Sequence, residues 1–253
     1  FLFKYFQINP ENKTSIEIFN FENNKYLPKL FYAKQDFKKN FKKLVELIEN
    51  NPEKNNIEIF NELPQNIQTK KIFEELNIDY KAWSETNPDS KIEYCNPDNS
   101  VIKAQKADLN NITKGLSIGE DVSCCTKLTG VFARCAVPYI TSKMIQAIEI
   151  CHNEMPIANT MCYLAKVNGS LSLILDNIEV KPQYQDERII RDLIFEYAEK
   201  LTEEIGCKDI PILLSAKRND ITTRDLPKYL YNISIVGNSG KDPIYLDFNT
   251  KDI

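Results

Sequence analysis

The chain has 253 residues, of which 42% are hydrophobic, and its formal net charge is −4. This hydrophobic content is sufficient for a packed core and excludes wholesale disorder. The slight acidity argues against non-specific nucleic-acid binding, which needs a basic face. No apolar run approaches the ~20 residues that a membrane-spanning helix requires. We therefore expect one large or two ordinary domains, with neither nucleic acid nor membrane as a partner.

The seven cysteines are odd in number and do not form a dense secreted framework. We therefore expect reduced thiols in a cytoplasmic protein. Heavy use of Lys, Asn and Ile is typical of an AT-rich genome, and we expect a bacterial source, with a secreted effector as the alternative. The chain begins at Phe1 without an initiator Met, which indicates a segment of a longer polypeptide.

The first hundred residues predict a small αβ unit. Residues 33–51 carry apolar side chains at helical spacing, with Lys on the opposite face. Residues 56–60 alternate like a strand, a second helix begins at Pro64, and residues 78–80 are a further candidate strand. Residues 84–100 are rich in Asn, Pro, Asp and Ser, which favours a linker or long loop. We therefore expect an N-terminal αβ domain or half over residues 1–100 and a second domain over residues 101–253.

The second half predicts a sheet with covering helices. Apolar spacing over residues 142–151 favours a helix on one sheet face. Residues 161–167 and 170–180 are β-prone, and Asn168-Gly169 between them supplies the two positive φ angles of a tight hairpin turn. A long amphipathic run over residues 188–205 predicts a helix that ends at Gly206. Residues 211–216 and 242–248 are the next candidate strands.

This order resembles the central motif of the GNAT acyltransferase superfamily. In that family a strand ends in Val-x-Pro-x-x-(Gln/Arg)-x-x-Gly-x-(Gly/Ala) and runs directly into a helix. Val180, Pro182 and Gln185 match the first three positions, whereas Arg188 and Ile190 occupy the two glycine positions. The departure matters because glycines let backbone amides close on a pyrophosphate. The resemblance implies an α/β (α+β) fold: a GNAT-like mixed sheet with flanking helices, after the smaller N-terminal unit.

The resemblance also implies acetyl-CoA as cofactor, an unknown amine as acceptor and no metal. The residues that it assigns to the cofactor are Ile178, Val180, Gln185, Arg188, Ile189, Ile190 and Asn219. The strand end near residues 178–180 would supply an amide to the thioester, and Glu179 is the candidate general base. Tyr229 is the expected acid for the leaving thiolate, with Tyr231 as the alternative. The same tyrosines and Glu179 also fit packing or solvated positions.

A cysteine cluster offers a different chemistry. Cys124, Cys125 and Cys135 lie close in sequence, and Cys151-His152 follow. A metal site here lacks the C-x-x-C spacing that presents two thiolates to zinc. A nucleophilic site would use Cys124 or Cys125 with His152, the only histidine, and Asp176 as its orienter. The plainest interpretation is that these are small, reduced thiols buried in the core.

Three functions therefore follow from the sequence. The first is an acyl-CoA-dependent N-acyltransferase that acetylates an amine. The second is a catalytically inactive GNAT-like binding module of a larger protein. The third is a cysteine-dependent hydrolase or transferase using Cys124 or Cys125 with His152.

Overall fold

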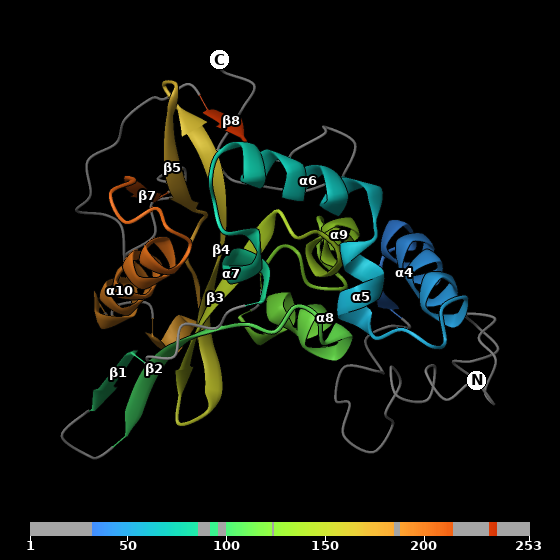
Figure 1. The fold of residues 1–253 in the computed structure, drawn as a ribbon. Coiled ribbons are helices and arrows are strands. Elements are labelled where there is room, and N and C mark those ends of the chain that lie inside the picture. The colour runs from blue at the N-terminus through green and yellow to red at the C-terminus, as the bar shows by residue number, and fades with distance from the viewer. Residues whose placement is uncertain are drawn as a thin grey trace. The chain divides into compact units, whose positions relative to one another are not determined.

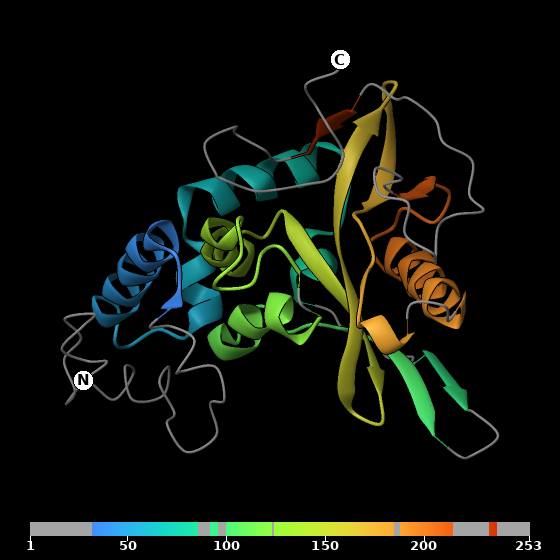
Figure 2. The same cartoon turned by 180° about the vertical axis from the view of Figure 1, so that it is seen from behind.

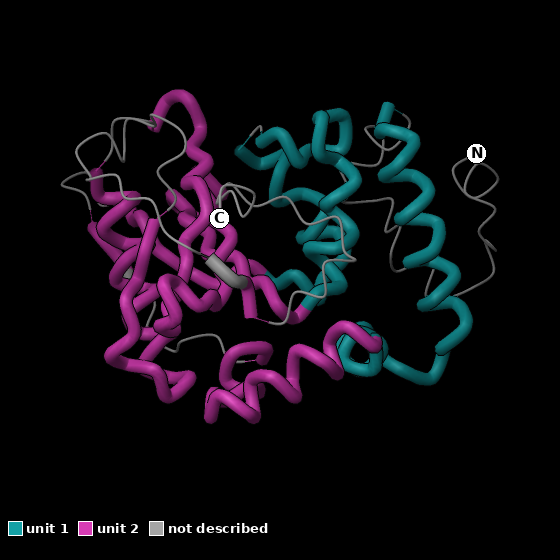
Figure 3. Tube along the Cα trace, turned by 90° about the horizontal axis from the view of Figure 1, so that it is seen from above, with its two compact units in different colours: residues 1–63, 108–142, 243–245 teal, residues 64–107, 143–242, 246–253 magenta. Residues whose placement is uncertain are grey.

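The computed structural model describes residues 32–85, 92–95, 100–122, 124–184, 188–214 and 233–236. These residues form two compact units, which Figure 3 colours separately. Of the described residues, unit 1 contains those within 32–63 and 108–142, and unit 2 contains those within 64–107 and all those from residue 143 onward. In this division residues 64–107 group with the sheet, and the boundary near residue 100 stays a prediction.

Unit 1 is helical in its described part. Its elements are α4 (Gln35–Glu49), α5 (Asn56–Asn61), α8 (Ile112–Asp121), the short 3-10 helix η1 (Ala133–Cys135) and α9 (Ala136–Thr141). Helix α4 confirms the helical spacing of the sequence, since its five periodic apolar residues are all buried: Phe37, Phe41, Leu44, Val45 and Ile48. They pack with apolar residues of α5, α8 and α9 in one core.

The expected strand over residues 56–60 is wrong, because these residues form helix α5. A capping box explains the difference. The Asn55 side chain accepts a hydrogen bond from the Glu58 backbone N–H at 3.0 Å, and the Glu58 carboxylate accepts one from the Asn55 N–H at 2.9 Å. This reciprocal pairing satisfies amides that a helix start leaves open, and it outweighs the alternating apolar pattern.

Unit 2 is built on a mixed sheet with flanking helices (Figures 1 and 2). Its helices are α6 (Pro64–Glu75), α7 (Tyr80–Glu85), η2 (Pro182–Tyr184) and α10 (Arg188–Glu204). Its strands are β1 (Ile92–Cys95), β2 (Val101–Lys106), β3 (Ile145–His152), β4 (Met155–Val167), β5 (Ser170–Leu175), β6 (Glu179–Val180), β7 (Ile212–Leu214) and β8 (Ile233–Ile235). The helix α6 was expected, whereas the candidate strand over residues 78–80 is wrong because α7 begins at Tyr80.

The strand order is β1-β2-β3-β4-β5-β7, and β6 and β8 pair with β4 outside this path. All neighbouring strands are antiparallel except β5 and β7, which are parallel. Parallel neighbours need a crossover connection, and α10 provides it. Helix α10 buries one face, including Leu193, Ile194 and Tyr197, in the main core of unit 2.

The hairpin, crossover helix and following strand agree with the sequence. Asn168 and Gly169 have φ angles of 49° and 85°, as a tight turn between β4 and β5 requires. Gly206 follows α10 with a φ of 79°, which is the left-handed conformation of a helix end. The expected strand at residues 242–248 lies outside the described residues.

The expected helix over residues 142–151 is wrong, because most of this segment is strand β3. Seven of the eight residues of β3 are buried. A strand buried on both faces carries apolar residues at nearly every position, so its sequence has no clear alternation. In such a run the helical spacing of Met144, Ile145, Ile148 and Cys151 does not discriminate between the two structures.

Among the helices that the structure describes, none combines the length and apolar character needed to cross a membrane.

Candidate functional site

A β-bulge interrupts the strand that enters α10. Leu175 lies opposite Cys162, and Glu179 lies opposite Asn159. From Leu175 to Glu179 the chain advances by four residues, whereas the facing stretch of β4, from Cys162 to Asn159, spans only three. One extra residue is therefore inserted within residues 176–178. Bulges re-aim side chains and end strand pairing, and they are frequent beside active sites.

The bulge leaves a buried backbone amide that has no acceptor among the described residues. The Lys181 N–H donates to the Ile157 oxygen at 2.9 Å. In an antiparallel ladder every second residue points its N–H to the same partner strand. The Glu179 N–H therefore points toward β4, whereas the Ile178 and Val180 N–H groups point away from it. Ile178 is fully buried, and its N–H finds no acceptor among the described residues. Buried amides are almost always hydrogen-bonded, so an unpaired one beside a bulge calls for a structural or functional explanation.

A row of polar side chains crosses the sheet beside this bulge. The strand registers place Gln105, Glu149, Asn159 and Glu179 opposite one another on β2, β3, β4 and β6. Opposed residues of antiparallel strands project to the same face. Glu149 and Asn159 are buried, with exposed fractions of 1% and 4%. The row therefore sets two carboxylates on one face of the sheet.

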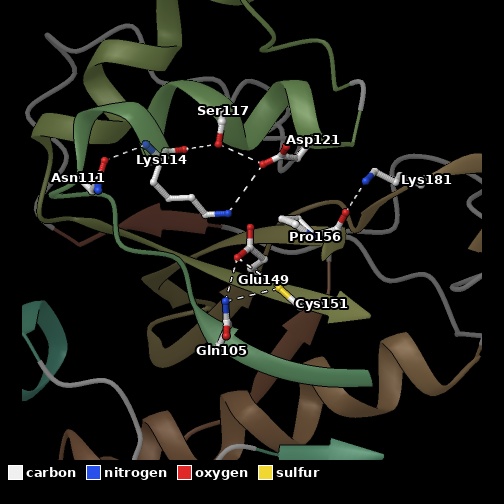
Figure 4. Close-up of polar contacts among 9 residues, drawn as sticks. All are labelled: Gln105, Asn111, Lys114, Ser117, Asp121, Glu149, Cys151, Pro156 and Lys181. Atoms are coloured by element: carbon white, nitrogen blue, oxygen red, sulfur yellow. Dashed lines mark hydrogen bonds and ion pairs between the residues drawn. The ribbon is translucent and has the colours of Figure 1, made fainter. Parts of the chain in front are cut away.

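Each carboxylate of the row has a polar neighbour. The Asn177 side-chain amide donates to the Glu179 Oε1 at 3.1 Å, from within the bulge. The Gln105 side-chain amide donates to the Glu149 Oε2 at 3.1 Å, and the Cys151 Sγ lies 3.6 Å from the same oxygen (Figure 4). These contacts fix the carboxylates of Glu149 and Glu179. Sequence reasoning selected Glu179 but missed Glu149, since only the strand register aligns the two residues.

The residues expected to bind a cofactor lie in three places. Ile178 and Val180 flank Glu179 at the bulge, and both are buried. Arg188 is the first residue of α10 and is exposed. Ile190, in the second glycine position of the motif, is fully buried in the core of unit 2, and Ile189 packs against that core. Gln185, Asn219, Tyr229 and Tyr231 lie outside the described residues.

His152 has a partner other than a cysteine. Its Nδ1 lies 2.8 Å from the hydroxyl of Tyr184, and the two rings meet edge-on. Its Nε2 is buried and has no hydrogen-bond partner among the described residues. His152 belongs to unit 2, whereas Cys124 and Cys125 belong to unit 1, so a Cys–His pair stays a prediction. Cys125 is half-buried, within a turn of unit 1.

The described residues contain no group of three or more His, Cys, Asp or Glu side chains placed to hold a metal ion.

Known protein-family models do not match the chain. The search of curated proteins gives no match either. Among solved structures, the chain is similar to a ribosomal-protein-alanine N-acetyltransferase from Brucella melitensis biovar Abortus 2308, at 16% identity and a TM-score of 0.38. It is also similar to a possible acetyltransferase from Clostridium difficile 630, at 13% identity and a TM-score of 0.35. Each similarity covers 51% of this chain and 96% of the other.

The described elements of unit 2 follow a definite order. An antiparallel β3-β4-β5 meander leads through a bulge into α10, which returns to β7 parallel to β5. This is the layout that the sequence resemblance implied. This mixed sheet with flanking helices is consistent with a GNAT-like fold. The described strands of the sheet all lie in unit 2.

Proposed function

We propose that the chain transfers an acyl group from acetyl-CoA to an amine acceptor. The observation that carries this proposal is the buried Ile178 N–H, which has no acceptor in the described chain and lies next to Glu179. A fixed N–H group in a dry environment stabilises the negative charge that develops on a carbonyl oxygen during acyl transfer. Acetyl-CoA would supply the activated acyl group as its thioester.

Glu179 is our candidate for the group that takes the proton from the amine. Its carboxylate oxygen accepts the Asn177 amide hydrogen bond, which holds the side chain beside the bulge. A general base must be within reach of the reacting proton, and Glu179 directly follows the residue with the open amide. The role of Tyr229 as acid for the thiolate remains part of this proposal.

Arg188 is our candidate for an anion contact at the start of α10. The first amides of a helix lack intrahelical acceptors, and together with the helix dipole they favour a phosphate. The exposed guanidinium of Arg188 adds a charged donor at this end. The pyrophosphate of coenzyme A has the matching charge.

A binding module without catalysis is the second candidate function. It is favoured by Ile190, which fills the second glycine position of the motif and is fully buried in the core. A glycine there would allow close approach of a pyrophosphate to the backbone. In this case the fold would persist while acetyl-CoA binding is absent.

Calorimetric titration with acetyl-CoA and with free coenzyme A distinguishes the two candidates. We expect dissociation constants in the micromolar range, about −8 kcal/mol, and at least tenfold weaker binding by Arg188→Glu. Lys200→Glu is the matched control, because it makes the same charge change near the other end of α10. Absence of binding to the unsubstituted chain would refute the acyltransferase proposal.

Substitution of Glu179 tests the catalytic step separately from binding. We expect Glu179→Gln to lower kcat by about 100-fold or more, as loss of a general base does, while acetyl-CoA binding stays unchanged. The readout is thiol release with a panel of amines, including peptides, aminoglycosides and polyamines. Glu93→Gln on β1 is the control, since Glu93 is exposed. Unchanged turnover in Glu179→Gln would exclude Glu179 as the base.

A further inference from the structure

Two neighbouring cysteines of unit 1 hold their sulfur atoms in contact. Cys124 and Cys125 lie in the turn that follows α8, and their Sγ atoms are 3.8 Å apart. Cys124 is 9% exposed, and Cys125 is half-buried. The Thr126 hydroxyl donates to the Cys124 Sγ at 3.3 Å. The two thiols therefore lie side by side and differ in access.

Several hydrogen bonds hold the backbone around the two thiols in place. The Cys124 N–H donates to the Gly119 oxygen at 2.8 Å, and the Lys127 N–H donates to the Cys124 oxygen at 3.1 Å. The Leu128 N–H donates to the Glu120 carboxylate at 3.0 Å. A Cβ on Gly119 would lie 2.8 Å from the Lys127 nitrogen, so α8 and the turn are in close contact.

This fixation has a chemical consequence for the thiols. Two groups that are held together react as if at high effective concentration, because the entropy of bringing them together is already lost. A reagent that needs both sulfurs is thus favoured over one that needs a single sulfur. A pair of buried, separated thiols would have no such preference.

We propose that Cys124 and Cys125 form a redox-active dithiol that a small disulfide, such as oxidised glutathione, converts reversibly to a disulfide. The Cys125 thiolate attacks one sulfur of the reagent, forming a mixed disulfide and releasing one thiol. The Cys124 thiolate then attacks the Cys125 sulfur, forming the Cys124–Cys125 bond and releasing the second thiol. Two electrons and two protons pass from the protein to the reagent. Cys125 acts first because it is the more accessible of the two.

Oxidation is expected to disturb the turn itself. A disulfide needs about 2.05 Å between sulfurs, which is much shorter than the 3.8 Å in the reduced turn. The peptide between the cysteines must therefore adjust. The Cys125 carbonyl accepts the Phe132 N–H at 3.1 Å, and Gly130 is so close that a Cβ there would be 2.1 Å from this oxygen.

Peptide mapping of the full chain tests the proposal. The chain is treated with excess oxidised glutathione at neutral pH, alkylated and cut with trypsin without reduction. The tryptic peptide 115–127 contains Cys124 and Cys125 and no other cysteine. We expect this peptide to lose two hydrogen atoms, to take up no alkyl group and to recover both thiols with dithiothreitol. A doubly alkylated peptide, or a bond to the peptide containing Cys135, would overturn the proposal.

Single substitutions distinguish the attacking thiol, Cys125, from the resolving thiol, Cys124. In Cys124→Ser we expect a stable glutathione adduct on Cys125, because no second thiol remains to resolve it. In Cys125→Ser we expect Cys124 to stay reduced over the same period. Cys135→Ser is the control and should oxidise like the unsubstituted chain. Equal glutathione adducts in both single variants would contradict the assigned order. Circular dichroism checks that each variant is folded.

Discussion

At the scale of single residues, the proposed function depends on a backbone N–H group and on strand register, neither of which the type of side chain reveals. The Ile178 N–H belongs to an apolar residue, yet it is the group on which the acyl-transfer proposal depends. Glu179 was visible in the sequence as a carboxylate near a strand end. The Glu149 carboxylate was not selected, because its alignment with Glu179 exists only once β3, β4 and β6 have paired.

Gly130 provides a residue-scale prediction. A Cβ at this position would lie 2.1 Å from the Cys125 oxygen and 3.0 Å from the Lys127 oxygen, both of which belong to the backbone. We expect Gly130→Ala to lower the free energy of unfolding by about 1–3 kcal/mol, as overpacking does. Urea denaturation of Gly130→Ala and the unsubstituted chain measures this difference in the free energy of unfolding.

Gly169→Ala is the comparison for this prediction. A Cβ at Gly169 meets no atom within 4 Å, so only the positive φ of 85° opposes the substitution. We expect a loss of about 1 kcal/mol from that conformation. If Gly130→Ala were as mild as Gly169→Ala, the close contact at Gly130 would not be a real constraint.

At the scale of elements, local signals predicted part of the fold. The Asn168-Gly169 turn, the amphipathic α10 and its closing Gly206 all have local causes, and the structure confirms them. Strand β3 and helix α5 were predicted wrongly for two different reasons. Burial on both faces removes the alternation from β3, and a side-chain cap overrides the alternation in α5. The bulge escaped prediction because it is defined by the register between two strands.

The capping box of α5 gives an element-scale prediction. Asn55→Ala removes the acceptor for the Glu58 N–H, and a six-residue helix has few other hydrogen bonds to hold its start. We expect a loss of about 1 kcal/mol in the free energy of unfolding, measured by thermal or urea denaturation. Gln68→Ala, on the exposed side of α6, is the control and should change the free energy of unfolding by only a few tenths of a kcal/mol. A loss in Gln68→Ala equal to that in Asn55→Ala would argue against a specific cap.

At the scale of the whole molecule, the free energy of unfolding depends on pH in the alkaline range through Cys162, which lies in the sheet core of unit 2. This thiol is fully buried, and burial raises its pKa from 9.0 to about 12. The folded protein therefore retains a proton that the unfolded chain has lost above pH 9. The associated stability is complete below pH 9 and is lost progressively as the pH rises from 9 toward 12.

Cys162→Ala tests this linkage. The unsubstituted chain should lose about 1.4 kcal/mol of unfolding free energy per pH unit in this window from Cys162 alone. The variant should be less stable at neutral pH because of its smaller side chain, but its stability should fall less steeply with pH. Cys95→Ala, at an exposed position, should keep the full slope. Identical slopes in Cys162→Ala and the unsubstituted chain would show that Cys162 is not responsible.

The interleaving of the two units along the chain has a consequence for the order in which they fold. Unit 1 joins residues 32–63 to residues 108–142, and the Asn40 side chain bonds to the Arg134 oxygen across 94 residues of sequence. Helix α4 is synthesised long before α8 and α9, whose apolar residues share its core. A nascent chain must therefore carry α4 without α8 and α9, which share its core, while residues 64–107 emerge. During that interval the helix is a natural binding site for a chaperone.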